Sequence, residues 1–354
     1  MKVNKIVALM LGMGLFVSPV FSQTPTPLTD LQKGVNEFSE SLVKSLPFNA
    51  AIGLNWSDAY IGKVFPSLPP HFGVGVSMGM TSMKIGAFTE LLNVFDVGAL
   101  GSLGNLAFMP LPAYAAEARV GGVFLPFDLG FKFGMLPEGS LPLGDAKLNY
   151  TLLGASLRIA PLELLLSGNP LLLVLPSISV GVGVNHLSGG IGDISIGKSM
   201  EFTFGTGTIP YKLKIDQPKL GLSWETTALD FTLQASKSLL IITPYIGVGV
   251  SSAKSKAGYG VTTKVTYTDD SGSQQDLTNA ANLDSLKNNL ETAGLGGIDV
   301  DANGFKSIIE DKGVSVRAFG GLSFNLAVIR IDLTGMFNFT DQNWGVSLGT
   351  RFQL

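Results

Sequence analysis

An alternation of apolar and polar side chains constrains the fold of this chain more than any other feature of its sequence. It is clearest in the last eleven residues, 344–354. The apolar face carries Trp344, Val346, Leu348, Phe352 and Leu354, with Thr350 among them, and the polar face carries Gly345, Ser347, Gly349, Arg351 and Gln353. Because successive side chains of a strand point to opposite sides, this pattern predicts a two-faced β-strand. An open edge strand invites pairing with other chains, so we expect this strand to close a ring.

The same pattern recurs upstream, and its charges stay on one face. In residues 329–339, Ile331 falls on one face of the predicted strand and its neighbours Arg330 and Asp332 fall on the other. Residues 177–184 alternate in the same way. A strand with lipid on one side and a lumen on the other requires this arrangement. A water-soluble β-sandwich, the alternative, would carry charges on its exposed faces. Here the faces opposite the lumen almost lack them, which favours a membrane barrel.

The composition leads to the same fold class. Only 14% of residues are charged, against roughly 25% in soluble domains, and the mean hydropathy is +0.35. After the amino-terminal segment, no uninterrupted apolar stretch reaches the roughly 18 residues of a spanning helix. In lipid every backbone polar group must be paired internally, so the alternative to helices is a closed barrel. We therefore predict an all-β fold, a closed antiparallel transmembrane β-barrel of about 12–14 strands with an amino-terminal amphipathic helix.

The amino-terminal residues 1–22 have the features of a secretory signal peptide. A basic start at Lys2 and Lys5 precedes an apolar run, and Val20 and Ser22 occupy positions −3 and −1 of a cleavage site. The chain contains no cysteine, which excludes a disulfide framework and a lipid-modified cysteine anchor. We expect export of the protein to the outer membrane of a diderm bacterium.

Two segments do not alternate. Residues 23–47 place apolar side chains at helical spacing, which predicts an amphipathic helix that either rests at the periplasmic rim or plugs the lumen. Residues 81–113 form an apolar insertion that either folds into the barrel or lines an apolar pocket. The barrel is expected to span 48–354, with its first strand near Phe48–Trp56. Counting strands back from a periplasmic carboxyl end places the long polar segment 269–312 in an extracellular loop.

The terminal strand resembles that of bacterial outer-membrane β-barrel proteins, which the barrel assembly machinery recognises as a signal. It differs from the commonest form because the last residue is Leu354 and the aromatic Phe352 stands two places earlier. The resemblance implies membrane lipid and the assembly machinery as partners. The whole layout also looks like the long-chain fatty-acid transporters of outer membranes, which have a similar length and an amino-terminal plug. That resemblance implies a hydrophobic small-molecule solute.

Few residues offer catalytic chemistry. Histidine occurs twice, as His71 and His186, and the nearest candidate for a hydrolase pair is His186 with Ser188. A histidine at a strand end near the interface is more often a polar rim residue, so we expect that the protein is not an enzyme. The net charge of −3 and the scattered basic residues argue against a nucleic-acid partner.

One metal-binding motif is present, in the predicted outer loop. Residues 299–310 match the calcium-loop pattern D-x-[DN]-x-[DN]-G-x5-E. Its positions are filled by Asp299, Asp301, Asn303, Gly304 and Glu310. Alternate oxygens would surround one side of Ca²⁺ and the Glu310 carboxylate would close the other, so calcium is the one cofactor that the sequence indicates. The alternative is a polar surface loop in which Asp301 or Asn303 caps a short helix at 304–311.

These features predict a transport barrel for passive uptake of small hydrophobic solutes such as fatty acids. A general porin, one alternative, needs a water-filled lumen with rings of charge, and the predicted strands offer few charged positions. The other alternative is a structural or adhesive barrel that acts through the surface loop 269–312.

Overall fold

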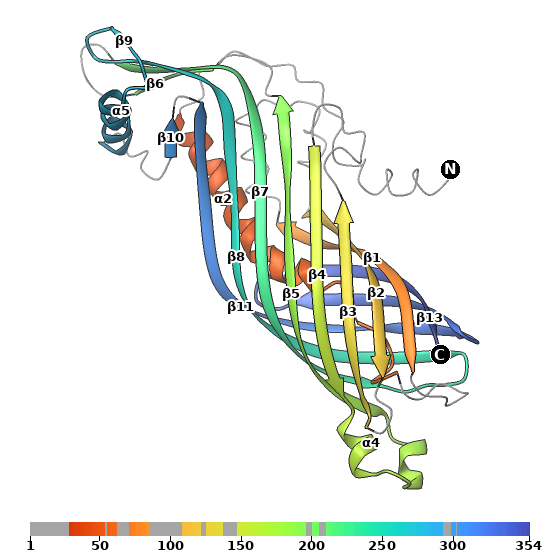
Figure 1. Cartoon of the computed structure of the whole chain (residues 1–354). Helices are drawn as coiled ribbons and strands as arrows, with labels where there is room; N and C mark the ends of the chain where they lie inside the picture. The colour runs from red at the N-terminus through yellow and green to blue at the C-terminus, as the bar shows by residue number, and fades with distance from the viewer. Residues whose placement is uncertain are drawn as a thin grey trace, which may run out of the picture.

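Ten strands close into one antiparallel barrel in the computed structural model of the chain (Figure 1). The structure describes residues 28–53, 55–61, 71–84, 108–121, 125–136, 147–195, 200–204, 210–292, 299–301 and 303–354. The barrel strands, in order around the ring, are β1 (Phe72–Lys84), β2 (Phe108–Gly121), β3 (Phe127–Leu136), β4 (Lys147–Ile159), β5 (Ser177–Ser195), β7 (Tyr211–Ser236), β8 (Ile242–Thr268), β11 (Gly304–Leu326), β12 (Ile329–Asn338) and β13 (Asn343–Gln353). The barrel architecture predicted from the sequence is thus confirmed.

The strand number is lower than the predicted 12–14, because segments 244–252 and 259–267 each alternate like a separate strand but both belong to β8. With 27 residues, β8 far exceeds the roughly 9–11 residues that cross a bilayer. The predicted first strand at Phe48–Trp56 is also wrong, because the strand that pairs with β13 is β1, with Gly73 opposite Gln353. The closing role of the last strand is confirmed, since β13 pairs with β12 on one side and β1 on the other.

The alternation places apolar side chains outside and polar ones inside, as predicted. In β5, Val180 is 52% exposed and its neighbour Ser179 only 2%. Along β12, Leu333 is exposed while Arg330 is buried. The exposed apolar side chains form a band around the barrel, which is the surface expected of a strand wall in contact with lipid.

The two ends of the barrel differ in their connections. The short-turn end has the connections 122–126, 160–176, 237–241 and 327–328, and it also holds the last residue, Leu354, which pairs with Phe72. The long-loop end has the connections 85–107, 137–146, 196–210, 269–303 and 339–342. The connection 160–176 is the longest at the short-turn end, and it contains helix α4 (Pro161–Leu165) and 3-10 helix η3 (Pro170–Leu173).

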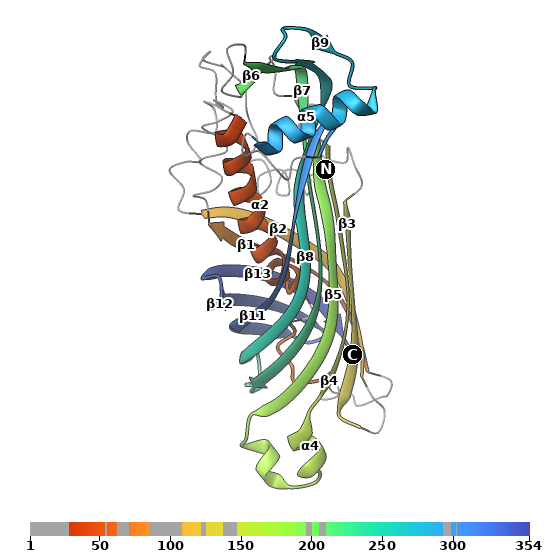
Figure 2. The ribbon, with the colours of Figure 1, turned by 90° about the vertical axis from the view of Figure 1, so that its left-hand side faces the viewer.

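A small folded unit, the outer cap, stands at the long-loop end (Figure 2). It consists of β6 (Met200–Phe204), β9 (Gln274–Gln275), α5 (Ala280–Thr292) and β10 (Asp299–Asp301), together with the adjoining ends of β7 and β8. Leu286 and Leu290 of α5 are buried, and Asn289 donates a hydrogen bond to the Tyr267 hydroxyl (2.9 Å). The cap therefore has a core of its own.

Helix α2 (Leu28–Ala50) lies inside the barrel (Figure 1). Ser41 donates to the carbonyl of Lys84, at the long-loop end of β1, and Asn343 at the start of β13 donates to Ser45 (3.1 Å). The helix thus enters from the long-loop end and descends toward the short-turn end. None of the helices in the described ranges combines the length and the apolar character needed to cross a membrane.

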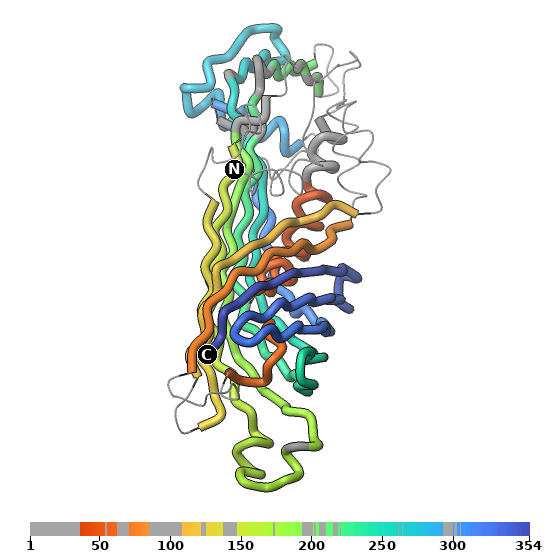
Figure 3. Tube along the Cα trace, turned by 90° about the vertical axis from the view of Figure 1, so that its right-hand side faces the viewer, coloured from red at the N-terminus to blue at the C-terminus, as the bar shows by residue number. Residues whose placement is uncertain are grey.

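The wall changes direction between β2 and β3. Figure 3 shows β1 and β2 running obliquely away from the upright strands β3, β4 and β5. The β2–β3 ladder runs only from Gly121 opposite Asp128 to Ala116 opposite Phe133, whereas β2 continues to Phe108. The remainder of β2 pairs with β1 alone within the described part of the chain.

Candidate functional site

The chain that follows α2 crosses the lumen, and side chains of the wall bind its backbone. We call residues 50–53 and 55–61 the plug segment. Lys132 of β3 donates from Nζ to the carbonyl oxygens of Ala50 (2.6 Å) and Ile52 (2.8 Å). The last carbonyls of a helix lack partners within it and carry partial negative charge, so a buried ammonium group stabilises them. No basic residue stands in the last turn of α2, and the wall supplies the cation instead.

Two further wall residues hold the middle of the plug segment. Arg158 of β4 donates from Nη1 to the carbonyl oxygens of Asp58 (2.7 Å) and Trp56 (3.2 Å). Gln234 of β7 donates from Nε2 to those of Trp56 (2.9 Å) and Ser57 (3.0 Å). These contacts satisfy carbonyls that would otherwise be buried without a partner, which is costly in a lumen closed to water.

Trp56 is the central side chain of the plug segment. Its indole Nε1 donates to Glu117 (2.6 Å), and the guanidinium carbons of Arg351 and Arg119 lie 4.7 Å and 5.5 Å from its ring centre. Both distances are within the range of cation–π attraction. Gly73 of β1 makes room for the indole, because a Cβ there would lie 2.7 Å from a ring carbon.

Ion pairs anchor the end of the plug segment to the wall. Asp128 of β3 is fully buried and accepts hydrogen bonds from Arg119 (2.5 Å) and Arg158 (2.7 and 3.0 Å). The same carboxylate also accepts a hydrogen bond from the backbone N–H of Ile61 (3.1 Å). One wall carboxylate thus pairs with two guanidinium groups and holds the Ile61 end of the plug segment.

Asp58 makes the corresponding contacts with the last two strands. Its carboxylate accepts from Arg351 (2.9 Å) and Gln353 (3.1 Å) of β13 and lies 3.5 Å from Arg330 of β12. Arg351 also donates to Asp332. The strand that closes the barrel is therefore tied directly to the plug segment.

These contacts form a closed layer, the lumen floor. Its charged side chains are Asp58, Glu117, Arg119, Asp128, Lys132, Arg158, Asp230, Arg317, Arg330, Asp332 and Arg351. The expectation of few charged lumen positions is therefore wrong, because charged residues scattered in the sequence are buried in the lumen, most of them in contact with one another or with the plug segment. A cavity beside Trp56 and β13 measures only about 20 Å³, the space of about one water molecule. Around Trp56 the described part of the floor is closely packed.

The sequence analysis did not single out these floor residues. Each one on the wall stands in phase with the polar face of its strand, as Arg351 and Arg330 already do in the carboxyl-terminal alternation. A count of charged residues at inward positions would have found them.

Above the floor, toward the long-loop end, the buried side chains are mostly apolar, with hydrogen-bonded Ser45, Asn49 and Asn343 among them. The helix contributes Phe38, Leu42, Val43 and Leu46, and the wall contributes Leu152, Leu187, Tyr259 and Met336, all buried. The lumen thus has two layers of opposite character. An apolar solute is compatible with the upper layer and would have to displace paired charges to cross the lower one.

Beyond the end of the β2–β3 ladder, side chains replace strand pairing. The Tyr150 hydroxyl of β4 lies 3.4 Å from the N–H and 3.3 Å from the carbonyl oxygen of Tyr114 on β2, and the two rings stack at 5.0 Å. Asn49 of α2 donates to the carbonyl of Leu111 (2.8 Å). Within the described ranges, the β2 edge is therefore held here by an aromatic side chain and an amide and no longer by ladder hydrogen bonds to β3, although the Gly134 backbone still lies close to the Tyr114 carbonyl. Such contacts give way more easily than a continuous ladder.

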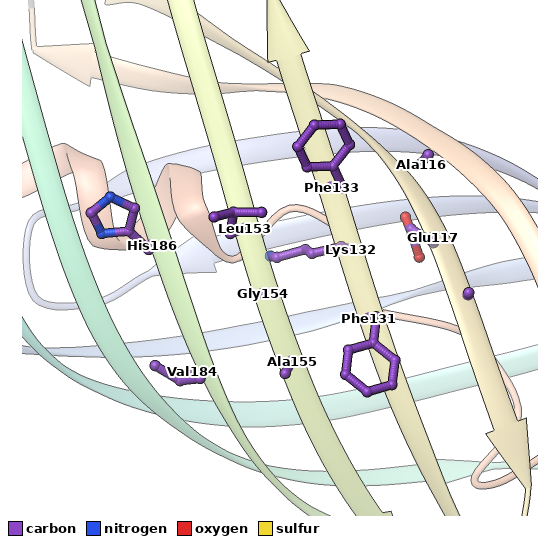
Figure 4. Close-up of a pocket in the computed structure, with 11 residues that line it drawn as sticks. Ala116, Glu117, Phe131, Lys132, Phe133, Leu153, Gly154, Ala155, Val184 and His186 are labelled. Carbon is purple, nitrogen blue, oxygen red and sulfur yellow. The ribbon is translucent and has the colours of Figure 1, made fainter.

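An apolar groove of about 580 Å³ lies on the wall beside this point (Figure 4). Its exposed rim includes Phe131 and Phe133 of β3, Leu153 of β4 and Val184 of β5. Gly154 also lines the groove, and a Cβ there would face inward and lie 2.5 Å from the Lys132 side chain; Lys132 and Glu117 of the floor line the groove from beneath. The groove thus joins the lipid-facing surface to the place where the β2–β3 ladder ends.

The calcium motif adopts an extended conformation. Asp299–Asp301 pairs with Gly304–Lys306 as a hairpin, and Gly304 to Glu310 continue along β11 opposite β8. Glu310 is 2.7 Å from Lys256, and the helix considered at 304–311 is absent because these residues form a strand. Within the described ranges no cluster of three metal-binding side chains occurs. Calcium binding stays a prediction, and it would require this hairpin to open.

The two histidines lie far from each other in the fold. His186 of β5 is part of the groove and has Nδ1 3.0 Å from the Thr227 hydroxyl, and Ser188 is two residues farther along the same strand. His71 is buried at the short-turn end, where its carbonyl accepts from the N–H of Gly121. Most of the predicted insertion 81–113, and the whole signal-peptide segment, lie outside the described residues.

Residues 101–354 match a protein family described as a family of unknown function, DUF6588. The chain belongs to DUF6588. No curated protein matches it. Among solved structures, the translocator domain of the autotransporter NalP from Neisseria meningitidis is similar with a TM-score of 0.36 and 7% identity, over 90% of this chain and 98% of that one. The outer-membrane protease OmpT from Escherichia coli is similar with a TM-score of 0.35 and 8% identity, over 81% and 97%. A FadL homologue from Pseudomonas aeruginosa has a TM-score of 0.24 and 8% identity, over 81% and 91%. At these values the likeness says nothing about the activity of this DUF6588 member.

Proposed function

We propose that this protein is an outer-membrane barrel for the passive uptake of small hydrophobic solutes such as fatty acids. In this proposal the solute enters at the long-loop end, follows the apolar upper lumen along α2, and leaves sideways between β2 and β3. The short-turn end faces the periplasm, because outer-membrane barrels carry short periplasmic turns and longer outer loops. Export by the signal peptide 1–22 is part of the same proposal.

The observation that carries this proposal is the ladder that stops at Ala116 and Phe133 beside an apolar groove. A solute on the direct axial path meets the paired charges of the lumen floor, where desolvation of each displaced charge is costly. On the sideways path it meets the Tyr114–Tyr150 contact and then lipid. The sideways path therefore has the lower barrier for an apolar molecule and a high one for an ion.

Engineered cysteines test the path. The chain has no native cysteine, so only introduced thiols react. The variant Ala113→Cys/Leu136→Cys places thiols on β2 and β3 beyond the ladder, where a short bis-maleimide, which adds one thiol at each end, would tie the strands together. The control Ala116→Cys/Phe133→Cys places them opposite each other inside the ladder. Uptake of a fluorescent fatty acid into proteoliposomes should fall on cross-linking the first pair and persist on cross-linking the second.

A measurement of ion conductance distinguishes the proposed uptake barrel from a general porin. The parent protein in a planar bilayer should conduct ions poorly, because the lumen floor is filled. A large steady conductance with no fatty-acid uptake would refute the proposal and favour a general porin. Equal uptake with either cross-link would refute the sideways path.

A surface-binding barrel is the second candidate, and the outer cap favours it. The cap has a core of its own, including Leu286 and Leu290, and aromatic stacking of Tyr211 with Phe204 (5.5 Å) and Tyr267 (6.1 Å). A loop that only connects two strands does not need a packed core, so the core of the outer cap favours a role in surface binding. Deletion of residues 274–292 separates the two functions, because a transporter should retain uptake and an adhesive barrel should lose surface binding.

A further inference from the structure

Two lysines face each other on the outer surface of the wall. Lys254 of β8 and Lys312 of β11 are directly opposite partners in the strand ladder, and both are exposed. Like charges in this position repel each other and destabilise a sheet. In the described part of the chain, no ion pair within 4.0 Å involves either lysine, whereas the next pair along, Lys256 and Glu310, is 2.7 Å apart.

The other charges near this pair do not cancel it. Glu310 is engaged by Lys256, and a hydrogen bond from Lys256 lowers the pKa of Glu310, with smaller contributions from Lys254 and Lys312. Glu225 of β7 is the direct ladder partner of Lys256. Thr227, the β7 partner of Lys254, is uncharged. The three lysines Lys254, Lys256 and Lys312 thus outnumber the two glutamates, which leaves a surplus of positive charge between β8 and β11.

The pair stands where the apolar band ends. Toward the short-turn end, the next outward positions with large side chains are Val314, Val316 and Val250, all at least 40% exposed. From Ile241 in the β7–β8 turn to Lys254, a strand rising roughly 3.3 Å per residue and tilted by about 45° covers about 30 Å along the membrane normal. That distance is close to the roughly 25 Å apolar band of outer-membrane barrels. The ammonium groups therefore lie at headgroup level on the long-loop side.

We propose that Lys254 and Lys312 together bind a phosphate group of an outer-leaflet lipid. Two ammonium groups across one ladder offer donors to a single phosphate, whose negative charge removes their repulsion. The inference rests on the outer-membrane placement proposed above but not on any transport step. It assigns the lysine pair as a lipid-binding site that also fixes the height of the barrel in the membrane.

The test compares Lys312→Gln with the parent in vesicles of two compositions. Full-length protein is reconstituted into phosphatidylcholine alone or with diphosphoryl lipid A, and the unfolding midpoint is read from heat-modifiable gel migration. Lipid A should raise the midpoint of the parent, and Lys312→Gln should lose most of that rise. In phosphatidylcholine alone the variant should melt at or above the parent midpoint, because it relieves a repulsion. A variant that merely disturbed folding would melt lower in both.

Two controls separate the sources of phosphate and the sites. Lys212→Gln removes an exposed lysine of the cap, paired with Glu201 at 3.4 Å, and should keep the full rise with lipid A. Inorganic phosphate added to phosphatidylcholine vesicles should not reproduce the rise. An equal rise in the parent and Lys312→Gln, or the same rise with inorganic phosphate, would overturn the proposal. Fatty-acid uptake in phosphatidylcholine should be unchanged in Lys312→Gln, so the outcome is independent of the transport proposal.

Discussion

Asp128→Asn should destabilise the barrel strongly, because it removes one charge that two buried cations share. The carboxylate accepts from Arg119, from Arg158 at two positions, and from the Ile61 N–H. The amide keeps the shape but presents one acceptor oxygen, so both guanidinium groups lose their ionic partner. Breaking a buried ion pair by removing one partner costs about 3–5 kcal/mol.

Remaining contacts reduce this cost. Arg158 still donates to the carbonyls of Trp56 and Asp58, and Arg119 keeps its contact with Ser156 (3.2 Å) and the Trp56 ring. We therefore expect a loss near the lower limit, about 3 kcal/mol in the free energy of unfolding. Because Ile61 also loses its acceptor, the end of the plug segment should loosen and ion conductance should rise.

The assay is equilibrium unfolding in denaturant with the barrel in detergent or lipid, followed by gel migration. Glu201→Gln is the matched control, since Glu201 pairs with Lys212 at 3.4 Å and both side chains are about half exposed. Exposed pairs contribute about 0–1 kcal/mol, so this variant should unfold almost as the parent does. If Asp128→Asn lost no more than the control, water would have to reach the floor, and the account of a closed lumen would be refuted.

Three further predictions follow from the barrel and the cap. Val180→Arg, in the middle of the apolar band, should cost about 2–4 kcal/mol, whereas Thr227→Arg, beside Lys254, should cost at most about 1 kcal/mol. Parallel unfolding titrations of the two variants measure this difference, and equal costs would contradict the position of the band. Deletion of Phe352–Leu354 removes the pairing with the start of β1, so little protein should reach the folded, heat-modifiable form. Hydrogen bonds from Ser271, Ser273 and Gln275 hold the pKa of Asp269 below its ordinary 3.8, so this support is present above that pH and disappears as the pH falls through the lowered value. Hydrogen exchange at acid pH should then show the 269–275 turn opening while the barrel remains protected.

The faces of the strands could be predicted from the sequence, because a period of two is a local property. The alternation in 344–354 identifies the outward Leu348 and the inward Arg351 without any knowledge of neighbours. The number of strands could not be predicted as well, because nothing local shows that a strand continues beyond the membrane. β8 alternates over 27 residues, most of them outside the length that lipid requires.

The lumen floor was hidden for a different reason. Lys132 binds the carbonyl of Ala50, which is 82 positions away in the chain, and Arg351 reaches Asp58 across 293 positions. Such contacts depend on the register of the whole ring and on the path of the plug segment, neither of which is encoded in a short motif. The calcium motif shows that a short motif can also mislead. Residues 299–310 match the pattern completely, but they form a hairpin and a strand that do not gather the five residues around one point.

The bond between Asp58 and the closing strand has a consequence for the order of assembly. The strand that closes the ring, β13, carries Arg351, and that residue holds the plug segment, which precedes β1 in the chain. A half-built barrel therefore lacks the guanidinium that neutralises Asp58, and a closed barrel with an empty lumen leaves Arg351 without its Asp58 contact. Ring closure and lumen filling should accordingly occur as one cooperative event. Partly folded molecules would be either open sheets or finished barrels, and a leaky intermediate would not accumulate in the membrane.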